Sequence, residues 1–272
     1  MQIQMVTFSE SKDGNTPEEW QDGAGGGVFG EANGTARFIV VDGATQAYDP
    51  LRWVDQLVTS FVPPPGAGPN PGGPRLEPAA MRAWFAAMQD RWTANVRAFD
   101  SIIEERKFNE VGSFATLLGL EISGLDSEEP FWRAVALGDT VLFHVRAGRL
   151  IATFPPMGPD DFGTLPDGVH TLRSSLDRMT GRLLVGSGVL APGDFLFAAT
   201  DAMAHWILRA VGREETKVWD MLGGLAHPDV FARFVEDQRR EQDGAKRMKN
   251  DDVTLMRLRM LADQPAFLLA CR

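Results

Sequence analysis

The sequence has little of the chemistry that cross-links chains or binds soft metals. Its 272 residues include one cysteine, Cys271, which stands next to the C-terminal residue. One cysteine excludes a disulfide within the chain and a zinc site built on clustered cysteines, and it favours a reducing cytoplasm as the location. We expect a frayed chain end around Cys271 and assign it no role as a catalytic thiol.

Histidine, long apolar runs and positive charge are also scarce. The four histidines show no spacing typical of metal ligands, so each is interpreted as an ordinary surface or partly buried side chain: His144, His170, His205 and His227. No apolar run reaches about 18 residues and no charged-then-apolar leader is present, so we expect neither a membrane span nor a signal peptide. The net charge of -10 argues against nucleic acid as a partner, because phosphate backbones require clustered Lys and Arg.

Aspartates, in contrast, recur at the ends of apolar runs. Three runs end in an aspartate and a fourth follows one: 38–41 before Asp42, 134–138 before Asp139, 195–200 before Asp201 and 253–256 after Asp251 and Asp252. If these runs are strands, they bring four carboxylates to one edge of a sheet, where like charges repel unless a cation lies among them. Each run alone is also compatible with a plain turn.

The hydrophobic periodicity predicts an α+β chain. Expected strands are 3–8, 28–29 paired with 37–41 around Asn33-Gly34, 113–122, 131–137, 140–145, 149–154, 183–185, 194–199 and 253–261. Expected helices are 50–61, 79 to about 107, 202–211, 215–222 and 228 to about 241. Loops are expected at 9–27, in the Pro/Gly-rich stretch at about 62–78 and at 155–180. This order predicts an α+β sandwich in one domain over residues 1–272, with the Pro/Gly-rich stretch as a surface loop.

Six short motifs run through most of the chain in a fixed order. They are Val41-Asp42-Gly43, Gly112-Ser113, Leu137-Gly138-Asp139, Leu190-Ala191-Pro192-Gly193-Asp194, Ala199-Thr200-Asp201 and Asp251-Asp252-Val253-Thr254. Together they resemble the motifs of the metal-dependent protein phosphatases of type 2C, the PPM family, in its bacterial Ser/Thr phosphatase form. The resemblance implies two packed antiparallel β-sheets flanked by pairs of helices, an α-β-β-α sandwich.

The resemblance also implies an activity. Such phosphatases hydrolyse phosphoserine and phosphothreonine in proteins by a water that bridges two Mg²⁺ or Mn²⁺ ions, so a phosphoprotein and a Ser/Thr kinase or its target are the expected partners. Carried over by motif, Asp42 bridges the metals, the Gly43 carbonyl binds one of them, and Asp201 and Asp251 bind the other. Asp139 matches an acid that helps to hold a third, looser metal.

Two further residues are assigned by position. Asp22 corresponds to an acidic N-terminal motif and is expected to support the metal ligands. Lys12 is a candidate for binding the substrate phosphate, with a solvated surface lysine as the alternative. The chemistry is consistent with the resemblance, because carboxylate oxygens without His or Cys select Mg²⁺ or Mn²⁺. Such ions activate water near neutral pH, so no protein nucleophile is required.

Several positions depart from the motifs. Ala202 stands where a glycine usually follows the Thr-Asp pair of the motif. Trp20-Gln21-Asp22 stands where the motif has Asn-Glu-Asp, and the arginine that binds the substrate phosphate has no clear match. These departures leave open a catalytically weak pseudophosphatase that binds a phosphoprotein or partner. A scaffold in which the aspartates are only turn residues is a third reading. The segment 155–180 lies between Asp139 and Asp201 and is expected to form a mobile flap that selects substrate.

Overall fold

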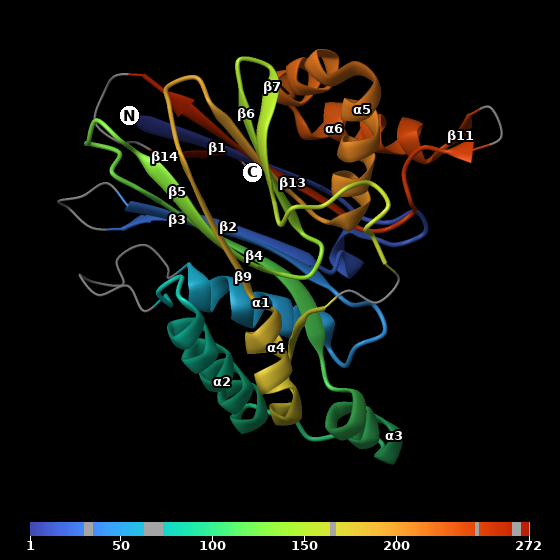
Figure 1. Cartoon of the computed structure of the whole chain (residues 1–272). Helices are drawn as coiled ribbons and strands as arrows, with labels where there is room; N and C mark the ends of the chain where they lie inside the picture. The colour runs from blue at the N-terminus through green and yellow to red at the C-terminus, as the bar shows by residue number, and fades with distance from the viewer. Residues whose placement is uncertain (30–34, 63–72, 164–166, 243–244, 263–267, 272) are drawn as a thin grey trace.

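Two six-stranded sheets are stacked face to face, with helices on both outer faces (Figure 1). The computed structural model describes residues 1–29, 35–62, 73–163, 167–242, 245–262 and 268–271. The expected α-β-β-α sandwich is therefore confirmed. Among these residues no helix has the length and apolar character needed to cross a membrane.

Sheet A contains the two ends of the chain. Its strand order is β14 (Leu268–Cys271), β1 (Gln2–Glu10), β13 (Val253–Leu261), β10 (Phe195–Ala199), β6 (Val141–Arg146) and β7 (Arg149–Phe154). All neighbours are antiparallel except β14, which pairs in parallel with β1 and places Cys271 opposite Val6. The expectation of a frayed end at Cys271 is therefore wrong, because the terminal segment adds a strand to an otherwise open sheet edge.

Sheet B contains neither end of the chain. Its order is β2 (Asp22–Phe29), β3 (Thr35–Gly43), β4 (Phe114–Ser123), β5 (Phe131–Leu137) and β9 (Leu184–Val189), and the short β8 (Val169–His170) also pairs with β4. The predicted turn Asn33-Gly34 lies outside the described residues, as do residues 63–72 of the predicted Pro/Gly-rich loop.

Helices cover each outer face. The helices on the side of sheet B are α1 (Pro50–Phe61), α2 (Pro78–Ala94), α3 (Ile102–Arg106) and α4 (Leu176–Arg182); those on the side of sheet A are α5 (Asp201–Gly224) and α6 (Pro228–Arg239) (Figure 1). Short elements complete the chain: η1 (Pro17–Glu19), η2 (Lys107–Val111), η3 (Arg173–Ser175), β11 (Glu241–Gln242) and β12 (Ala245–Lys246).

Three apolar cores separate these four layers, and β3 shows why. Phe38 and Val40 belong to the core between the sheets, whereas Ile39 and Val41 belong to the core under α1 and α2. Side chains alternate between the two faces of a strand, so a strand covered on both faces must be apolar at every position. The continuous run at 38–41 is thus the signature of a central layer. A third core lies between sheet A and the α5–α6 pair.

The predicted loop 9–27 is wrong in its second half. Residues 22–29 form β2, and its glycines are required by close packing rather than by turns. A Cβ on Gly23 would lie 2.3 Å from Val54 Cγ1, and one on Gly25 would lie 2.9 Å from Val58 Cγ1. Glycine therefore lets α1 lie directly on this strand, a use that glycine counts in sequence do not distinguish from a loop.

The predicted helix from 79 to about 107 is two helices, because residues 95–101 between α2 and α3 are not helical. The Asn95 side chain donates 2.9 Å to the Arg91 carbonyl, and the Ser101 hydroxyl accepts 3.2 Å from the Glu104 amide as a new N-cap. Side chains of this kind compete with helical hydrogen bonds and end a helix. Ile102 and Ile103 lie in the range predicted as one amphipathic helix, yet they are 69% and 76% exposed.

The predicted loop 155–180 is only partly correct. Residues 155–163 have no regular structure, but the later part contains β8, η3 and most of α4. α4 was not predicted because it is short and has a single buried residue, Met179, so it shows no apolar periodicity. It packs beside α2, where Asp177 and Arg82 form an ion pair of 2.7 Å. The strands predicted at 3–8, 113–122, 131–137, 140–145, 149–154, 194–199 and 253–261 and the helices at 50–61 and 228–241 are confirmed within a few residues.

Candidate metal centre

Five aspartates converge where strands of both sheets end. Asp22 opens β2 and lies directly opposite Asp42, near the end of β3, in the antiparallel register. Asp139 follows β5, Asp201 opens α5 immediately after β10, and Asp251 precedes β13. We call Asp22, Asp42, Asp139, Asp201 and Asp251 the aspartate cluster. The structure thus brings together all the carboxylates that the sequence assigned to the site.

Asp22 ties the two sheets together at this point. Its Oδ2 accepts hydrogen bonds from the hydroxyls of Thr200 at 3.0 Å and Thr254 at 2.7 Å. The Thr254 amide in turn donates 2.9 Å to the Thr200 hydroxyl. Asp22 is buried, and its second oxygen, Oδ1, has no hydrogen-bond partner in the described structure.

The charges of the cluster act on one another. Burial raises the pKa of Asp42 well above its usual range, and the charges of the four other cluster members raise it further. Burial also raises the pKa of Asp22 to about 8 and that of Asp139 to about 7, the latter with help from the charge of Asp201. Buried like charges are stable together only if they are protonated or share a cation.

A cation of the chain itself occupies part of this position. The Lys249 ammonium lies 3.0 Å from Asp201 Oδ2 and 2.6 Å from Asp251 Oδ2. Burial lowers the pKa of Lys249, but the hydrogen bond to Asp251 and the charge of Asp201 outweigh it and raise the pKa above its usual range. Burial likewise raises the pKa of Asp201, against the opposing charge of Lys249. The sequence analysis did not assign Lys249, although it stands two residues before Asp251.

The donor set fits a hard divalent cation. Two buried oxygens without a hydrogen-bond partner in the described structure, Asp22 Oδ1 and Asp139 Oδ1, remain available. Carboxylate oxygens without imidazole or thiolate are the ligands that Mg²⁺ and Mn²⁺ prefer. In the described part of the chain, however, no three acidic, His or Cys side chains are already gathered into a ligand cage. Lys249 holds two of the carboxylates, so a metal ion bound by Asp201 and Asp251 would have to displace its ammonium.

Gly43 occupies a place that no other residue fits. Its amide donates 3.2 Å to the Gln21 carbonyl, and a Cβ on Gly43 would lie 2.4 Å from that same oxygen. The backbone before β2 therefore crosses directly over the end of β3. Gln21 stands in place of an acid of the motif. Its backbone amide donates 2.8 Å to Asp252 Oδ2, and its side-chain oxygen is buried without a hydrogen-bond partner in the described structure.

Lys12 lies beside the turn that follows Asp42. Its ammonium donates 3.3 Å to the Thr45 hydroxyl, and its backbone amide donates 2.9 Å to Asp252 Oδ1. Asp252 is buried and thus anchors both halves of the loop between β1 and β2 to the start of β13. The sequence singled out Asp252 only as part of a motif.

Arg239 is a second anchor that the sequence gave no reason to select. The side chain is buried at the end of α6, donates 2.7 Å to the Ser11 carbonyl and contacts the carbonyl of Asp251. It also lies 3.3 Å from Asp13 Oδ1. A buried guanidinium bonded to two loops fixes where Asp251 and the loop that carries Lys12 sit relative to each other.

Ala202 causes no strain in the helix start. It lies in the first turn of α5, its amide donates 2.5 Å to Asp201 Oδ1, and it is not among the described residues with positive φ. The glycine that the motif usually carries is therefore not required for its backbone freedom here.

The segment 155–163 reaches α5 close to Asp201. The Phe162 ring packs against His205, one helical turn beyond Asp201, at a centroid distance of 5.3 Å. Burial lowers the pKa of His205, and the charge of Arg209 lowers it further. The segment thus lies near the aspartate cluster, while its role as a mobile flap remains a prediction.

The motif that ends in Asp194 lies elsewhere. It precedes β10, whereas Asp201 follows that strand, so about 17 Å of strand separates the two aspartates. Asp194 accepts hydrogen bonds from Arg146 at 2.7 and 2.8 Å, from His144 at 2.8 Å and from the Ala191 amide at 2.8 Å. This motif therefore closes a turn, and His144 is a fully buried structural residue.

The comparisons with known proteins support the architecture. No family model and no curated protein matches the sequence. Among solved structures, PppA, a regulatory component of T6SS in Pseudomonas aeruginosa, is 15% identical with a TM-score of 0.55 over 95% of this chain and 98% of its own. A serine/threonine phosphatase of S. agalactiae is 12% identical with a TM-score of 0.54 over 95% and 99% of the two chains.

A third similar structure contains the PP2C phosphatase domain and a regulatory-domain fragment of SpoIIE from Bacillus subtilis. It is 14% identical with a TM-score of 0.50, and the match covers 97% of this chain and 64% of that one. Identities this low carry information about architecture rather than activity. The chain, with its two stacked sheets and flanking helices, has the fold of the protein phosphatases of type 2C.

Proposed function

We propose that this protein is a metal-dependent phosphatase that hydrolyses phosphoserine and phosphothreonine in proteins. The observation that carries the proposal is the aspartate cluster: five carboxylates from distant parts of the chain meet at one place in a phosphatase fold. The pKa values of Asp22, Asp42, Asp139 and Asp201 are raised by burial and by neighbouring carboxylates, so a multivalent cation would stabilise the site.

Different aspartates of the cluster would have different roles. Asp42, Asp201 and Asp251 would hold a pair of Mg²⁺ or Mn²⁺ ions with the Gly43 carbonyl, and Asp139 would hold a further, looser ion. When bound, such ions supply an activated water near neutral pH and neutralise charge on the phosphoryl group. Asp22, bonded to Thr200 and Thr254, keeps the β2 end of the site in register with sheet A.

One other group would act on the substrate. Lys12 can offer its ammonium to a phosphoryl oxygen, because its contact with the Thr45 hydroxyl is long, at 3.3 Å. The partner is a phosphoprotein, together with a kinase that phosphorylates it.

The direct test is phosphate release by the purified protein. We expect hydrolysis of p-nitrophenyl phosphate and of a phosphothreonine peptide with Mn²⁺ or Mg²⁺, loss of both activities with EDTA, and recovery when Mn²⁺ is returned. A phosphotyrosine peptide of the same sequence serves as a specificity control. Absence of turnover with every divalent ion at neutral and mildly alkaline pH would contradict the proposal.

A second candidate, a pseudophosphatase that binds a phosphoprotein without hydrolysing it, is favoured by two observations. Gln21 replaces a carboxylate beside Asp22, and Lys249 neutralises Asp201 and Asp251 from within the chain. Calorimetry separates the two functions, since a pseudophosphatase would bind Mn²⁺ or a phosphopeptide and release no phosphate.

A further inference from the structure

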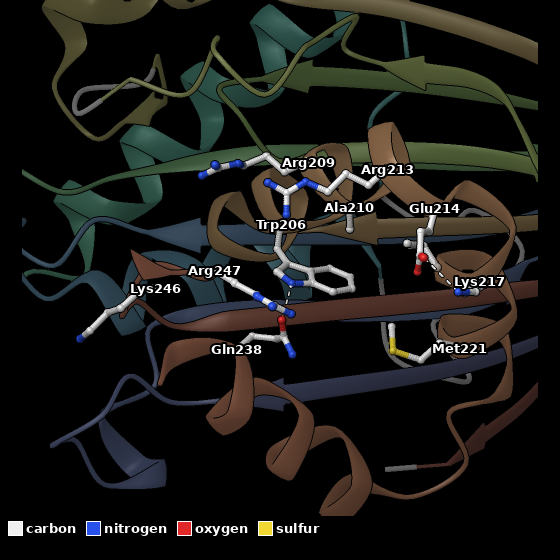
Figure 2. A pocket seen from close by; sticks show the side chains of 11 residues that line it. Trp206, Arg209, Ala210, Arg213, Glu214, Lys217, Met221, Gln238, Lys246 and Arg247 are labelled. Carbon is white, nitrogen blue, oxygen red and sulfur yellow. Dashed lines mark hydrogen bonds and ion pairs between the residues drawn. The ribbon is translucent and has the colours of Figure 1, made fainter. Parts of the chain in front are cut away.

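A basic pocket lies beside the aspartate cluster, on the outer side of α5. It has a volume of about 550 Å³ and opens between α5 and the segment that runs from α6 to β12 (Figure 2). Its floor contains Trp206, whose indole N–H donates 3.0 Å to Gln238 and whose ring packs edge-on against Phe234. Trp206 is only 9% exposed, so the floor is a fixed apolar surface.

Five cationic side chains surround this floor. Figure 2 shows the basic residues of α5 on one side of Trp206 and those of the β12 segment on the other: Arg209, Arg213, Lys217, Lys246 and Arg247. All five residues are exposed, and the one acid of the lining, Glu214, is paired with Lys217 at 2.9 Å. Within the described residues, no side-chain hydrogen bond or ion pair engages Arg209, Arg213 or Arg247.

This concentration of positive charge is unusual for the chain. The protein has a net charge of -10, yet five of its 27 basic residues line one concave site. Unpaired guanidinium groups above an apolar floor suit a ligand that carries carboxylates or phosphates on a partly apolar body. The pocket is therefore equipped for an anion rather than for a neutral ligand.

Two continuous stretches of chain connect the pocket to the aspartate cluster. Arg209 follows Asp201 by eight residues of α5, which is about 12 Å along the helix axis. On the other side, Arg247 precedes Lys249, the residue that contacts Asp201 and Asp251, by two positions. An extended peptide covers about 12 Å in roughly four residues, since each residue rises about 3.3 Å.

We propose that the basic pocket binds acidic side chains of the phosphoprotein substrate, about four residues from the phosphorylated residue. The inference rests on the proposed function, because it places that residue at the aspartate cluster. A protein segment fits better than nucleic acid, whose long phosphate backbone would extend beyond the pocket along a chain of net charge -10. It also fits better than a membrane, because the cations line a concavity with a buried tryptophan rather than a flat face.

The test compares matched phosphothreonine peptides. One set carries three Glu residues at positions three to five after the phosphothreonine, a second carries them at the same distance before it, and a third has Gln in all these places. We expect the wild-type protein to prefer one acidic set over the Gln set by about tenfold in kcat/KM. In the variant Arg209→Gln/Arg247→Gln the preference should fall to about twofold.

The matched control removes two positive charges from the opposite side of the molecule. Arg97→Gln/Arg106→Gln changes exposed arginines near α2 and α3, and it should keep the full preference for the acidic set. Each variant is its own reference, because the readout is a ratio of two substrates. An equal loss in both double variants would mean a general charge effect and would overturn the pocket assignment.

Failure of the inference and failure of the proposed function give different results. Turnover of p-nitrophenyl phosphate without any preference among the peptides would overturn the inference and leave the phosphatase. If no substrate is hydrolysed, the proposed function fails, and fluorescence anisotropy with the labelled acidic peptide then tests the pocket alone. Binding lost in Arg209→Gln/Arg247→Gln and kept in the control supports it; equal binding overturns it.

Other anions are outcomes of the same experiment. Sedimentation with phosphatidylserine vesicles, or binding of single-stranded DNA, is measured for the wild type and both double variants. If either depends on Arg209 and Arg247 while the acidic peptides show no preference, the substrate assignment is wrong.

Discussion

The aspartate cluster and the basic pocket lie near each other along α5 and are built in opposite ways. The cluster gathers carboxylates from strand ends across the whole sequence, mostly shielded from water. The pocket is lined by exposed cations from α5 and from the segment around β12, all within residues 206–247. Buried like charges strongly oppose one another, whereas exposed ones are screened by water and ions. The cluster is therefore stable when its carboxyl groups are protonated or neutralised by a cation, while the pocket can remain open for a ligand.

The largest expected effect separates chemistry from recognition. Asp42→Asn should lower turnover of both p-nitrophenyl phosphate and phosphopeptides by at least about 10³-fold, because the variant loses a proposed ligand of the ions that would supply the chemistry. The metal-free variant should unfold at a temperature no lower than wild type at pH 8, since an amide removes a charge that burial disfavours. Rates and calorimetric melting temperatures check both statements.

A matched variant is the control for this experiment. Asp126→Asn changes an exposed aspartate in the turn between β4 and β5 and should keep full activity. Retained turnover in Asp42→Asn, at the level of Asp126→Asn, would show that Asp42 is not a ligand and would break the contrast between the two regions.

The next effect concerns the internal cation. Lys249→Met should bind Mn²⁺ about tenfold more tightly than wild type, because the ammonium no longer competes for Asp201 and Asp251. Isothermal titration at fixed pH measures the affinity. Lys107→Met, at an exposed position in η2, is the control. An unchanged or weaker affinity in Lys249→Met would mean that Lys249 supports the site instead of competing with metal.

A smaller effect should appear in the pH dependence of stability. The pKa of Asp139 is about 7 and that of Asp22 about 8 in the folded protein, far above the ordinary value of 3.8. The folded state therefore binds more protons than the unfolded state between these values, so the free energy of unfolding falls as pH rises from about 4 to about 8. In EDTA the melting temperature should drop across this window, and saturating Mn²⁺ should reduce the drop.

The variant Asp139→Asn isolates one contribution to that slope. It removes a group that titrates near pH 7, so the drop in melting temperature should be smaller than in wild type by about 2–4 °C for each kcal/mol that is removed. Parallel melting curves for wild type and Asp139→Asn, from pH 4.5 to 8.5 in EDTA, would contradict the raised pKa of Asp139.

The smallest effect belongs to the basic pocket. Its cations are exposed, so raising the salt from about 0.05 to 0.5 M should reduce the preference for acidic over neutral phosphopeptides by about threefold. Turnover of p-nitrophenyl phosphate should change less, because the buried cluster is poorly screened. A preference that is independent of salt would indicate that the pocket acts by shape rather than by charge.

The sequence predicted much of this fold because local pattern and tertiary environment agreed. The run 38–41 was recognised as a strand because both of its faces are buried, and α1 was recognised from its apolar stripe. Errors occurred where a residue type served an unusual purpose. The glycines of β2 make room for α1, and Asn95 and Ser101 divide an apparently continuous helical stripe.

By itself, the sequence determined the order of the elements and which aspartates stand at the ends of strands, because hydrophobic period and turn chemistry are local properties. Only the tertiary structure decided that Lys249 lies between Asp201 and Asp251, that Asp252 and Arg239 anchor the loops, and that five cations meet around Trp206. These contacts join residues brought together by packing of sheets and helices. Their energies depend on distance and burial in space, which no spacing along the chain specifies.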